Sequence, residues 1–167
     1  HTNFNKIDYF VANNVFNKWL SRGKFNVYRH APNLFAQWAQ IALNLWIINP
    51  EPKYYDVASA FNKKFINSII HKQNGIIYWK SEFTKGTVLD VSHANSEISY
   101  LIQAYDNNLG ISFDQIELVM GILKRQILLK NGMIAFYLDG TGKTSFDNRW
   151  LIDGFLKLGR YDRTLQS

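Results

Sequence analysis

Four side chains that can exchange protons recur at helical spacing in the second half of the chain. They are Asp90, His93, Glu97 and Tyr100, separated by three, four and three residues. This spacing places all four on one face of an α-helix that begins near Asp90. Carboxylates, imidazole and phenol commonly act as general acids and bases. The stripe therefore predicts a polar catalytic site on a helical scaffold.

The same stripe has structural explanations that must be weighed against catalysis. Asp90 or Ser92 is also an ordinary N-cap, and a carboxylate at the start of a helix is favoured by the helix dipole. His93 and Glu97 are four residues apart and could ligate a metal together with His30 or Asp90. The chain has four histidines in total and no HExxH or calcium-loop motif. We therefore expect no metal and no other cofactor.

The remaining sequence predicts helices that would position this stripe. We expect an all-α fold in a single domain over residues 1–167, because no Ser/Gly-rich linker divides the chain. The spacing of apolar residues predicts two layers of helices. The outer helices would pack on one face, and the inner helices would pack on two faces. The expected outer helices span 5–21, 53–71 and 113–130, and the expected inner helices span 33–48, 90–108 and 148–160.

A unit of helix, glycine and short aromatic segment occurs three times along the chain. Its glycines are Gly23, Gly75 and Gly132, which are 52 and 57 residues apart. Glycine adopts a left-handed conformation at low cost, so we expect each of them to end the preceding helix. We expect the aromatic segment after each glycine to be extended. The repetition predicts about three antiparallel helical hairpins.

Composition restricts the class of ligand more than the compartment. The 167 residues are 16% aromatic, a content expected where flat rings stack on a ligand. The net charge of +6 favours an anionic partner. The basic residues are scattered, so nucleic acid is an unfavoured partner. The chain has no cysteine and suits an oxidising or a reducing compartment. No apolar run reaches the ~18 residues of a membrane span, so we expect no membrane insertion.

Four segments, in this order, resemble the α/α toroids of carbohydrate-active proteins. They are APNLFAQWAQIALNLW, PKYYDVASAFNKKF, GIIYWKSE and LDVSHANSEISYLIQAYDNNLGISF. The family's Glu-Asp-x-Ser-His-Ala motif has Leu89 in place of its glutamate here, whereas Asp90, Ser92 and His93 match. The resemblance spans nearly the whole chain and implies an arc of outer and inner helices around a cleft. A closed ring needs more than three hairpins, which implies a C-terminal fragment of a larger toroid, an open arc docked on another domain, or one protomer of an oligomer.

The resemblance also implies a saccharide ligand, and a lyase, hydrolase or epimerase activity on an acidic oligo- or polysaccharide. In a lyase or epimerase, His93 or Tyr100 would exchange the proton beside a uronate carboxyl. Asn95, with Arg29 or Arg149, would neutralise that carboxylate. A periplasmic or secreted location is favoured by the resemblance alone.

The aromatic segments before the inner helices would supply surfaces on which sugar rings stack. The candidates are Tyr28, Tyr78 and Trp79, although each could equally pack its loop onto the helices.

Two alternatives to proton abstraction stay open. A glycoside hydrolase would use Asp90 and Glu97 as acid and base, but seven residues of helix separate them by ~10 Å along its axis, slightly beyond the distance usual in inverting enzymes. A noncatalytic glycan-binding or protein-binding scaffold would close the Asp90, His93 and Glu97 stripe with internal salt bridges and leave no cleft that reaches it. Because of this separation between Asp90 and Glu97, we prefer proton abstraction over hydrolysis.

Overall fold

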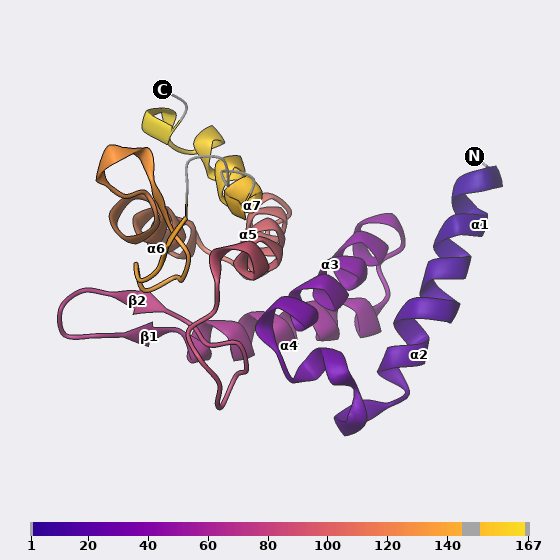
Figure 1. The fold of residues 1–167 in the computed structure, drawn as a ribbon. Coiled ribbons are helices and arrows are strands. Elements are labelled where there is room, and N and C mark those ends of the chain that lie inside the picture. The colour runs from indigo at the N-terminus through magenta and orange to yellow at the C-terminus, as the bar shows by residue number, and fades with distance from the viewer. Residues whose placement is uncertain (1, 145–150, 166–167) are drawn as a thin grey trace.

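The computed structural model describes residues 2–144 and 151–165 of the chain (Figure 1). Helices dominate these residues and the strands are very short, which confirms the predicted all-α class.

The amino-terminal helix is one continuous rod with a wider turn in its middle. Its parts are α1 (Thr2–Val11), a π-helical turn (Ala12–Phe16) and α2 (Asn17–Leu20), and the backbone stays right-handed at both junctions. Phe16 is fully buried and anchors the rod through its ring, 4.8 Å from that of Tyr54. The predicted helix over 5–21 is therefore present.

The next two helices form a tight antiparallel hairpin. They are α3 (Pro32–Ile48) and α4 (Pro52–Ser68), close to the predicted spans of 33–48 and 53–71. Each begins with a proline, whose missing N–H would have no partner in a first helical turn.

A second pair of helices carries the predicted stripe. α5 covers Val91–Asp106, with Asp90 as its N-cap, and α6 covers Phe113–Ile122 before a π-helical turn over Leu123–Ile127. Ser112 and Gln115 form a capping box that starts α6. These bounds agree with the expected helices over 90–108 and 113–130, apart from the last residues of each.

The carboxyl-terminal segment is less regular than predicted. It contains α7 (Asp153–Leu156), a 3-10 helix η7 (Lys157–Arg160) and a 3-10 turn η8 (Arg163–Leu165). Residues 148–150 of the predicted helix lie outside the described residues. The rest of that span divides into two short helices of different type, and Gly154 and Gly159 lie within it. Glycine has low helix propensity, which disfavours one long helix here.

The glycines of the repeat do not all end helices, which corrects the prediction. Gly23 follows α2 at a φ of +50°. Gly75 instead lies in the turn between β1 (Ile70–His71) and β2 (Ile77–Tyr78), beyond the end of α4. Gly132 ends a separate 3-10 turn, Lys130–Gly132.

The extended segments are likewise present in two of the three repeats. β2 follows Gly75, and β3 (Ile134–Ala135) follows Gly132 and pairs with β4 (Lys143–Thr144). After Gly23 the chain forms two 3-10 turns instead, η2 (Gly23–Phe25) and η3 (Val27–Arg29). Asn26 holds this arrangement, because its side chain accepts a hydrogen bond from the backbone N–H of Tyr28.

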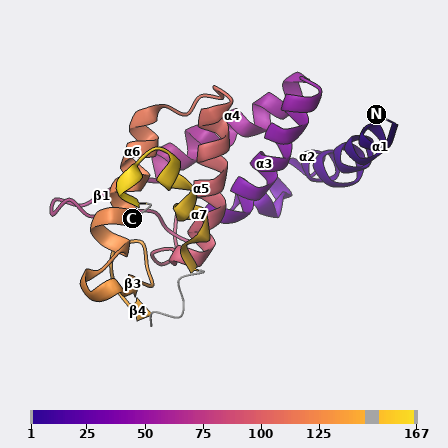
Figure 2. The same ribbon diagram turned by 90° about the horizontal axis from the view of Figure 1, so that it is seen from above.

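Alternate helices run in the same direction. The side chain of Gln37 donates to Ser96 Oγ over 3.4 Å, and that of Gln40 donates to Gln103 Oε1 over 2.9 Å. Residue numbers therefore rise together along α3 and α5. α7 packs on α5 as well, and α5 lies between α3 and α7 (Figure 2). The amino ends of α3 and α5 thus meet at one end of the molecule.

Aromatic rings fill the space beneath these helices. Contacts pass from Phe35 to Phe61, from Phe61 to Phe65 and Tyr100, and from Phe65 to Trp79, and all five rings are buried. None of the described helices has both the length and the apolar character needed to cross a bilayer.

Candidate functional site

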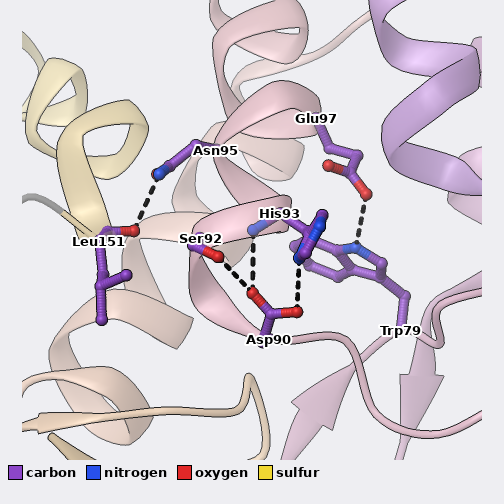
Figure 3. Close-up of polar contacts among 7 residues, drawn as sticks. All are labelled: Trp79, Asp90, Ser92, His93, Asn95, Glu97 and Leu151. Carbon is purple, nitrogen blue, oxygen red and sulfur yellow. Dashed lines mark hydrogen bonds and ion pairs between the residues drawn. The ribbon is translucent and has the colours of Figure 1, made fainter.

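Asp90 and His93 form a hydrogen-bonded pair at the amino end of α5 (Figure 3). Asp90 Oδ2 lies 2.6 Å from His93 Nδ1, and Asp90 Oδ1 accepts hydrogen bonds from Ser92 Oγ (2.5 Å) and from the backbone N–H of His93 (3.1 Å). The His93 side chain is 60% exposed, whereas that of Asp90 is 18% exposed. We call this pair the Asp90–His93 dyad.

The contacts of Asp90 keep its carboxylate charged. Burial raises the pKa of the Asp90 carboxyl, but the hydrogen bonds from Ser92 and from the backbone and ring of His93 outweigh burial and hold this pKa below its usual value. A carboxylate bonded to Nδ1 fixes the ring so that Nε2 can accept a proton. The dyad therefore has the arrangement of a general base with its orienting carboxylate.

Three extended backbone segments meet beneath the dyad and position it. The N–H of Leu89 donates to the carbonyl of Trp79 (3.0 Å), and the carbonyl of Leu89 accepts from the N–H of Leu138 (3.1 Å). The N–H of Val91 then donates to the carbonyl of Phe136 (2.9 Å). The segment before α5 is thus bonded on both sides, by residues that follow the second and third repeat glycines.

Tyr137 stands directly opposite Asp90 in this junction. The flanking bonds make the two residues a non-hydrogen-bonded antiparallel pair, whose side chains share one face with Cβ atoms ~5 Å apart. Tyr137 is 37% exposed, and its ring meets that of Phe136 edge-on at 4.9 Å. Sequence reasoning missed this aromatic pair beside the dyad. The repeat was the sequence signal that could have found this pair, because Phe136 and Tyr137 follow Gly132 as Tyr78 and Trp79 follow Gly75.

Glu97 lies one turn from His93 but is fully buried. Its Oε1 accepts a hydrogen bond from Trp79 Nε1 over 3.1 Å, and its Oε2 has no hydrogen-bond partner (Figure 3). Burial raises the pKa of the Glu97 carboxyl to about 8, opposed by hydrogen bonds from its own backbone and Trp79 and assisted by the charge of Asp90. At neutral pH Glu97 is therefore a neutral acid within the core, without contact to solvent.

Tyr100 is buried beneath α4 and takes part in a polar core contact. Its hydroxyl donates to Asn62 Oδ1 (2.7 Å), and Asn62 Nδ2 donates to the carbonyl of Leu109 (2.6 Å). Burial raises the pKa of the Tyr100 hydroxyl, although the bond to Asn62 opposes this rise. The Tyr100 phenol therefore makes a structural contact in the core, whereas the sequence predicted that it exchanges a proton with a substrate.

Replacing Tyr100 with phenylalanine tests the structural role of its hydroxyl. The change leaves Asn62 Oδ1 without its donor, so we expect the free energy of unfolding to fall by about 1–3 kcal/mol. Urea unfolding followed by circular dichroism measures the loss. Tyr105→Phe, on the same helix and half-buried, is the matched control and should stay close to wild type. Unchanged stability of Tyr100→Phe would contradict the structural role.

Asn95 joins α5 to the carboxyl-terminal segment. Its Nδ2 donates to the carbonyl of Leu151 (2.8 Å), and its Oδ1 accepts from the backbone N–H of Gly154 (2.9 Å). A Cβ at position 154 would lie 2.7 Å from the backbone of Asn95, so this close approach requires glycine. The predicted carboxylate-binding amide therefore has protein partners on both of its polar atoms.

The other predicted ligand-binding residues are dispersed. Trp79 is fully buried and has no exposed face on which a sugar could stack. Tyr28 is half-buried with its ring edge-on to Trp19 at 4.8 Å, and Tyr78 is half-buried beneath the ammonium group of Lys72. Arg29 precedes α3 and lies over aromatic rings. Arg149 lies outside the described residues.

Uncharged polar side chains continue from the dyad along the seam between α3 and α5. In addition to the two bonds that join these helices, Gln103 Nε2 donates to Asn44 Oδ1 over 2.5 Å. The seam is half-buried or exposed and consists of Gln37, Gln40, Asn44, Ser96 and Gln103. Amides and hydroxyls offer both donors and acceptors, which suits ligands rich in hydroxyl groups.

Two hollows in the described surface lie away from the dyad. One, with a volume of about 460 Å³, lies between the amino-terminal helix and the α3–α4 turn and is lined in part by Tyr9, Asn13 and Glu51. Another of about 300 Å³ lies between α4 and the start of α6, beside Ser59 and Lys63. Neither is lined by a residue of the predicted stripe. The dyad therefore stands on open surface rather than inside these hollows.

Searches against known protein families, curated proteins and solved structures find no match to this chain.

Proposed function

We propose that this chain is a carbohydrate-active protein that abstracts a proton from an acidic oligo- or polysaccharide. The observation that carries this proposal is the 2.6 Å contact between Asp90 Oδ2 and His93 Nδ1, with the His93 side chain 60% exposed. An oriented imidazole with a solvent-facing Nε2 is suited to general base catalysis. Among the four stripe residues, His93 is the one on exposed surface, since Glu97 and Tyr100 are buried.

In the proposed reaction, His93 Nε2 removes the proton from the carbon beside a uronate carboxyl. The electron pair of that C–H bond passes into the carboxyl group, and the Asp90 carboxylate stabilises the imidazolium that forms. In a lyase, the pair then forms a C=C bond while the glycosidic oxygen leaves and takes a proton from water or an acid. In an epimerase, a proton returns to the opposite face of the same carbon.

The surroundings of the dyad support a saccharide ligand. Tyr137 offers a partly exposed ring on the same face as Asp90, and aromatic rings stack well on sugars. The amide and hydroxyl seam of α3 and α5 starts within one turn of His93. The net charge of +6 favours an acidic ligand over a neutral one.

The toroid arrangement belongs to the same proposal. Parallel α3 and α5, together with the α3–α4 hairpin, are what an α/α arc requires, and this supports the resemblance seen in the sequence. In such an arc, further hairpins or a second copy of the chain would build a cleft around the dyad, which stands on open surface in this chain.

Deuterium incorporation tests the proposed reaction without prior choice between lyase and epimerase. The protein is incubated in D2O with alginate, polygalacturonate or hyaluronan, and the uronates are analysed by mass spectrometry. An epimerase introduces deuterium beside the carboxyl, and a lyase gives an unsaturated, ultraviolet-absorbing product. Neither product from any polyuronate, at a protein concentration that shows binding, would contradict proton abstraction.

A noncatalytic glycan- or protein-binding scaffold is the second candidate. The observation in its favour is the internal closure of the stripe, in which Asp90 pairs with His93 and Glu97 is held by Trp79 within the core. This candidate predicts saturable binding of a polyuronate with no isotope exchange. The hydrolase alternative requires Glu97 to reach a substrate, and we do not propose it because that carboxyl is fully buried.

A further inference from the structure

Two cationic side chains lie together near the amino end of α3, outside the dyad. Lys64, near the carboxyl end of α4, donates from Nζ to the backbone carbonyl of Arg29 over 2.6 Å. Its ammonium group also lies 4.3 Å from the centre of the Phe83 ring. The backbone N–H of Phe83 donates to the carbonyl of His30, which fixes this loop beside Arg29. The Lys64 ammonium is thus held close to Arg29 by two separate contacts.

The Arg29 side chain is held by aromatic rings rather than by hydrogen bonds. Its guanidinium carbon lies 5.0 Å from the centre of the Trp38 ring and 5.9 Å from that of Phe35. Its Nε is buried and has no hydrogen-bond partner. A guanidinium group carries five N–H donors, and none is used in a contact described for this side chain. Arg29 is therefore held by the rings, and its guanidinium makes no hydrogen bond with another described residue.

No carboxylate of the described residues pairs with either cation. Other cations of the described chain do have acidic partners, in the pairs Lys53–Glu51, Lys85–Glu82, Lys124–Asp162 and Arg160–Asp106. Burial, followed by repulsion from Arg29, lowers the pKa of the Lys64 ammonium. Neither positive charge therefore has a carboxylate partner among the described residues, and each is held against an aromatic ring.

We propose that Arg29 and Lys64 form a binding site for an oxyanion, such as a carboxylate, sulfate or phosphate group. An oxyanion accepts several hydrogen bonds at once and would engage the unused donors of both side chains. It would also remove the repulsion between them. The sequence also suggested Arg29 as a group that neutralises a uronate carboxylate, but this site involves neither residue of the dyad, and its test does not require the proposed reaction.

Calorimetric titration of the whole protein with sulfate, phosphate and glucuronate, at constant ionic strength, tests the site and identifies the oxyanion it prefers. We expect saturable binding of at least one of these anions by wild type. Lys64→Met removes one charge-assisted contact, so we expect about tenfold weaker binding or more. Lys63→Met is the matched control, because Lys63 is exposed, adjacent in sequence and of the same charge. It should bind like wild type.

Two outcomes would overturn the site. One is the absence of saturable binding of all three anions to wild type, and the other is equal weakening by Lys64→Met and Lys63→Met, which would reflect net charge alone. Arg29→Lys adds a second probe, since it keeps the charge but loses the planar fork of donors. Because the readout is binding of small anions, its failure would leave the isotope-exchange result unaffected.

Discussion

Replacing His93 with alanine is expected to lower turnover of the polyuronate substrate by about 100- to 10,000-fold, the contribution typical of a general base. Stability should change little, because the ring is 60% exposed and hydrogen-bonds to Asp90 alone among the described side chains. Isotope exchange in D2O measures turnover, and thermal unfolding followed by circular dichroism measures stability. The combination of lost turnover and preserved stability distinguishes a catalytic histidine from a structural one.

His71→Ala supplies the matched control for this experiment. His71 is an exposed residue of β1, outside the stripe, and its removal should leave turnover unchanged. Asp90→Asn keeps a polar N-cap but removes the charge that orients the imidazole, so its turnover should also fall. Wild-type turnover in His93→Ala would exclude the dyad as the base. A large fall in melting temperature would instead assign His93 to the fold.

Replacing Glu97 with glutamine is expected to stabilise the protein at high pH and to flatten its dependence on pH. The pKa of the Glu97 carboxyl is about 8 in the folded chain, compared with an ordinary value of 4.5. Between these values the unfolded chain releases this proton and the folded chain retains it. Wild-type stability therefore falls as pH rises from 4.5 to 8, by about 1 kcal/mol per pH unit for one proton. Below that window the carboxyl is protonated in both states.

Glutamine removes this titration and keeps an oxygen that can accept from Trp79 Nε1. Urea unfolding at a series of pH values gives the free energy of unfolding for both proteins, and their difference should grow with pH across the window. Glu117→Gln, at an exposed position of α6, should follow wild type at every pH. Parallel pH profiles for wild type and Glu97→Gln would contradict a buried neutral acid at this position.

The helical spans could be predicted because local signals agree with tertiary packing. Pro32 and Pro52 mark the starts of α3 and α4, and the period of buried residues in α3 and α5 matches the two faces on which each helix packs. The third inner helix was overestimated, since only Asp153–Leu156 is α-helical in its described part. Gly75 was misassigned because a turn of a β-hairpin and a helix end require the same left-handed backbone.

The candidate site was harder to predict than the fold. The spacing of three residues placed Asp90 and His93 on the same face of the helix, about one turn apart, and this is enough for their side chains to meet. It could not show that Glu97 and Tyr100 face the core, because burial depends on α4 and Trp79, which are distant in sequence. Tyr137 reaches Asp90 only through backbone pairing between two repeats, and helical periodicity carries no information about such pairing.

The backbone junction beneath Asp90 links the chemistry of the chain to its folding cooperativity. Leu89, at its centre, is bonded to Trp79 on one side and to Leu138 on the other. The amino end of α5 can be released only when both neighbours detach, so local fraying of one loop does not free it. The dyad therefore belongs to a cooperative unit that spans the second and third repeats, and heating should disrupt its geometry together with that unit rather than before it.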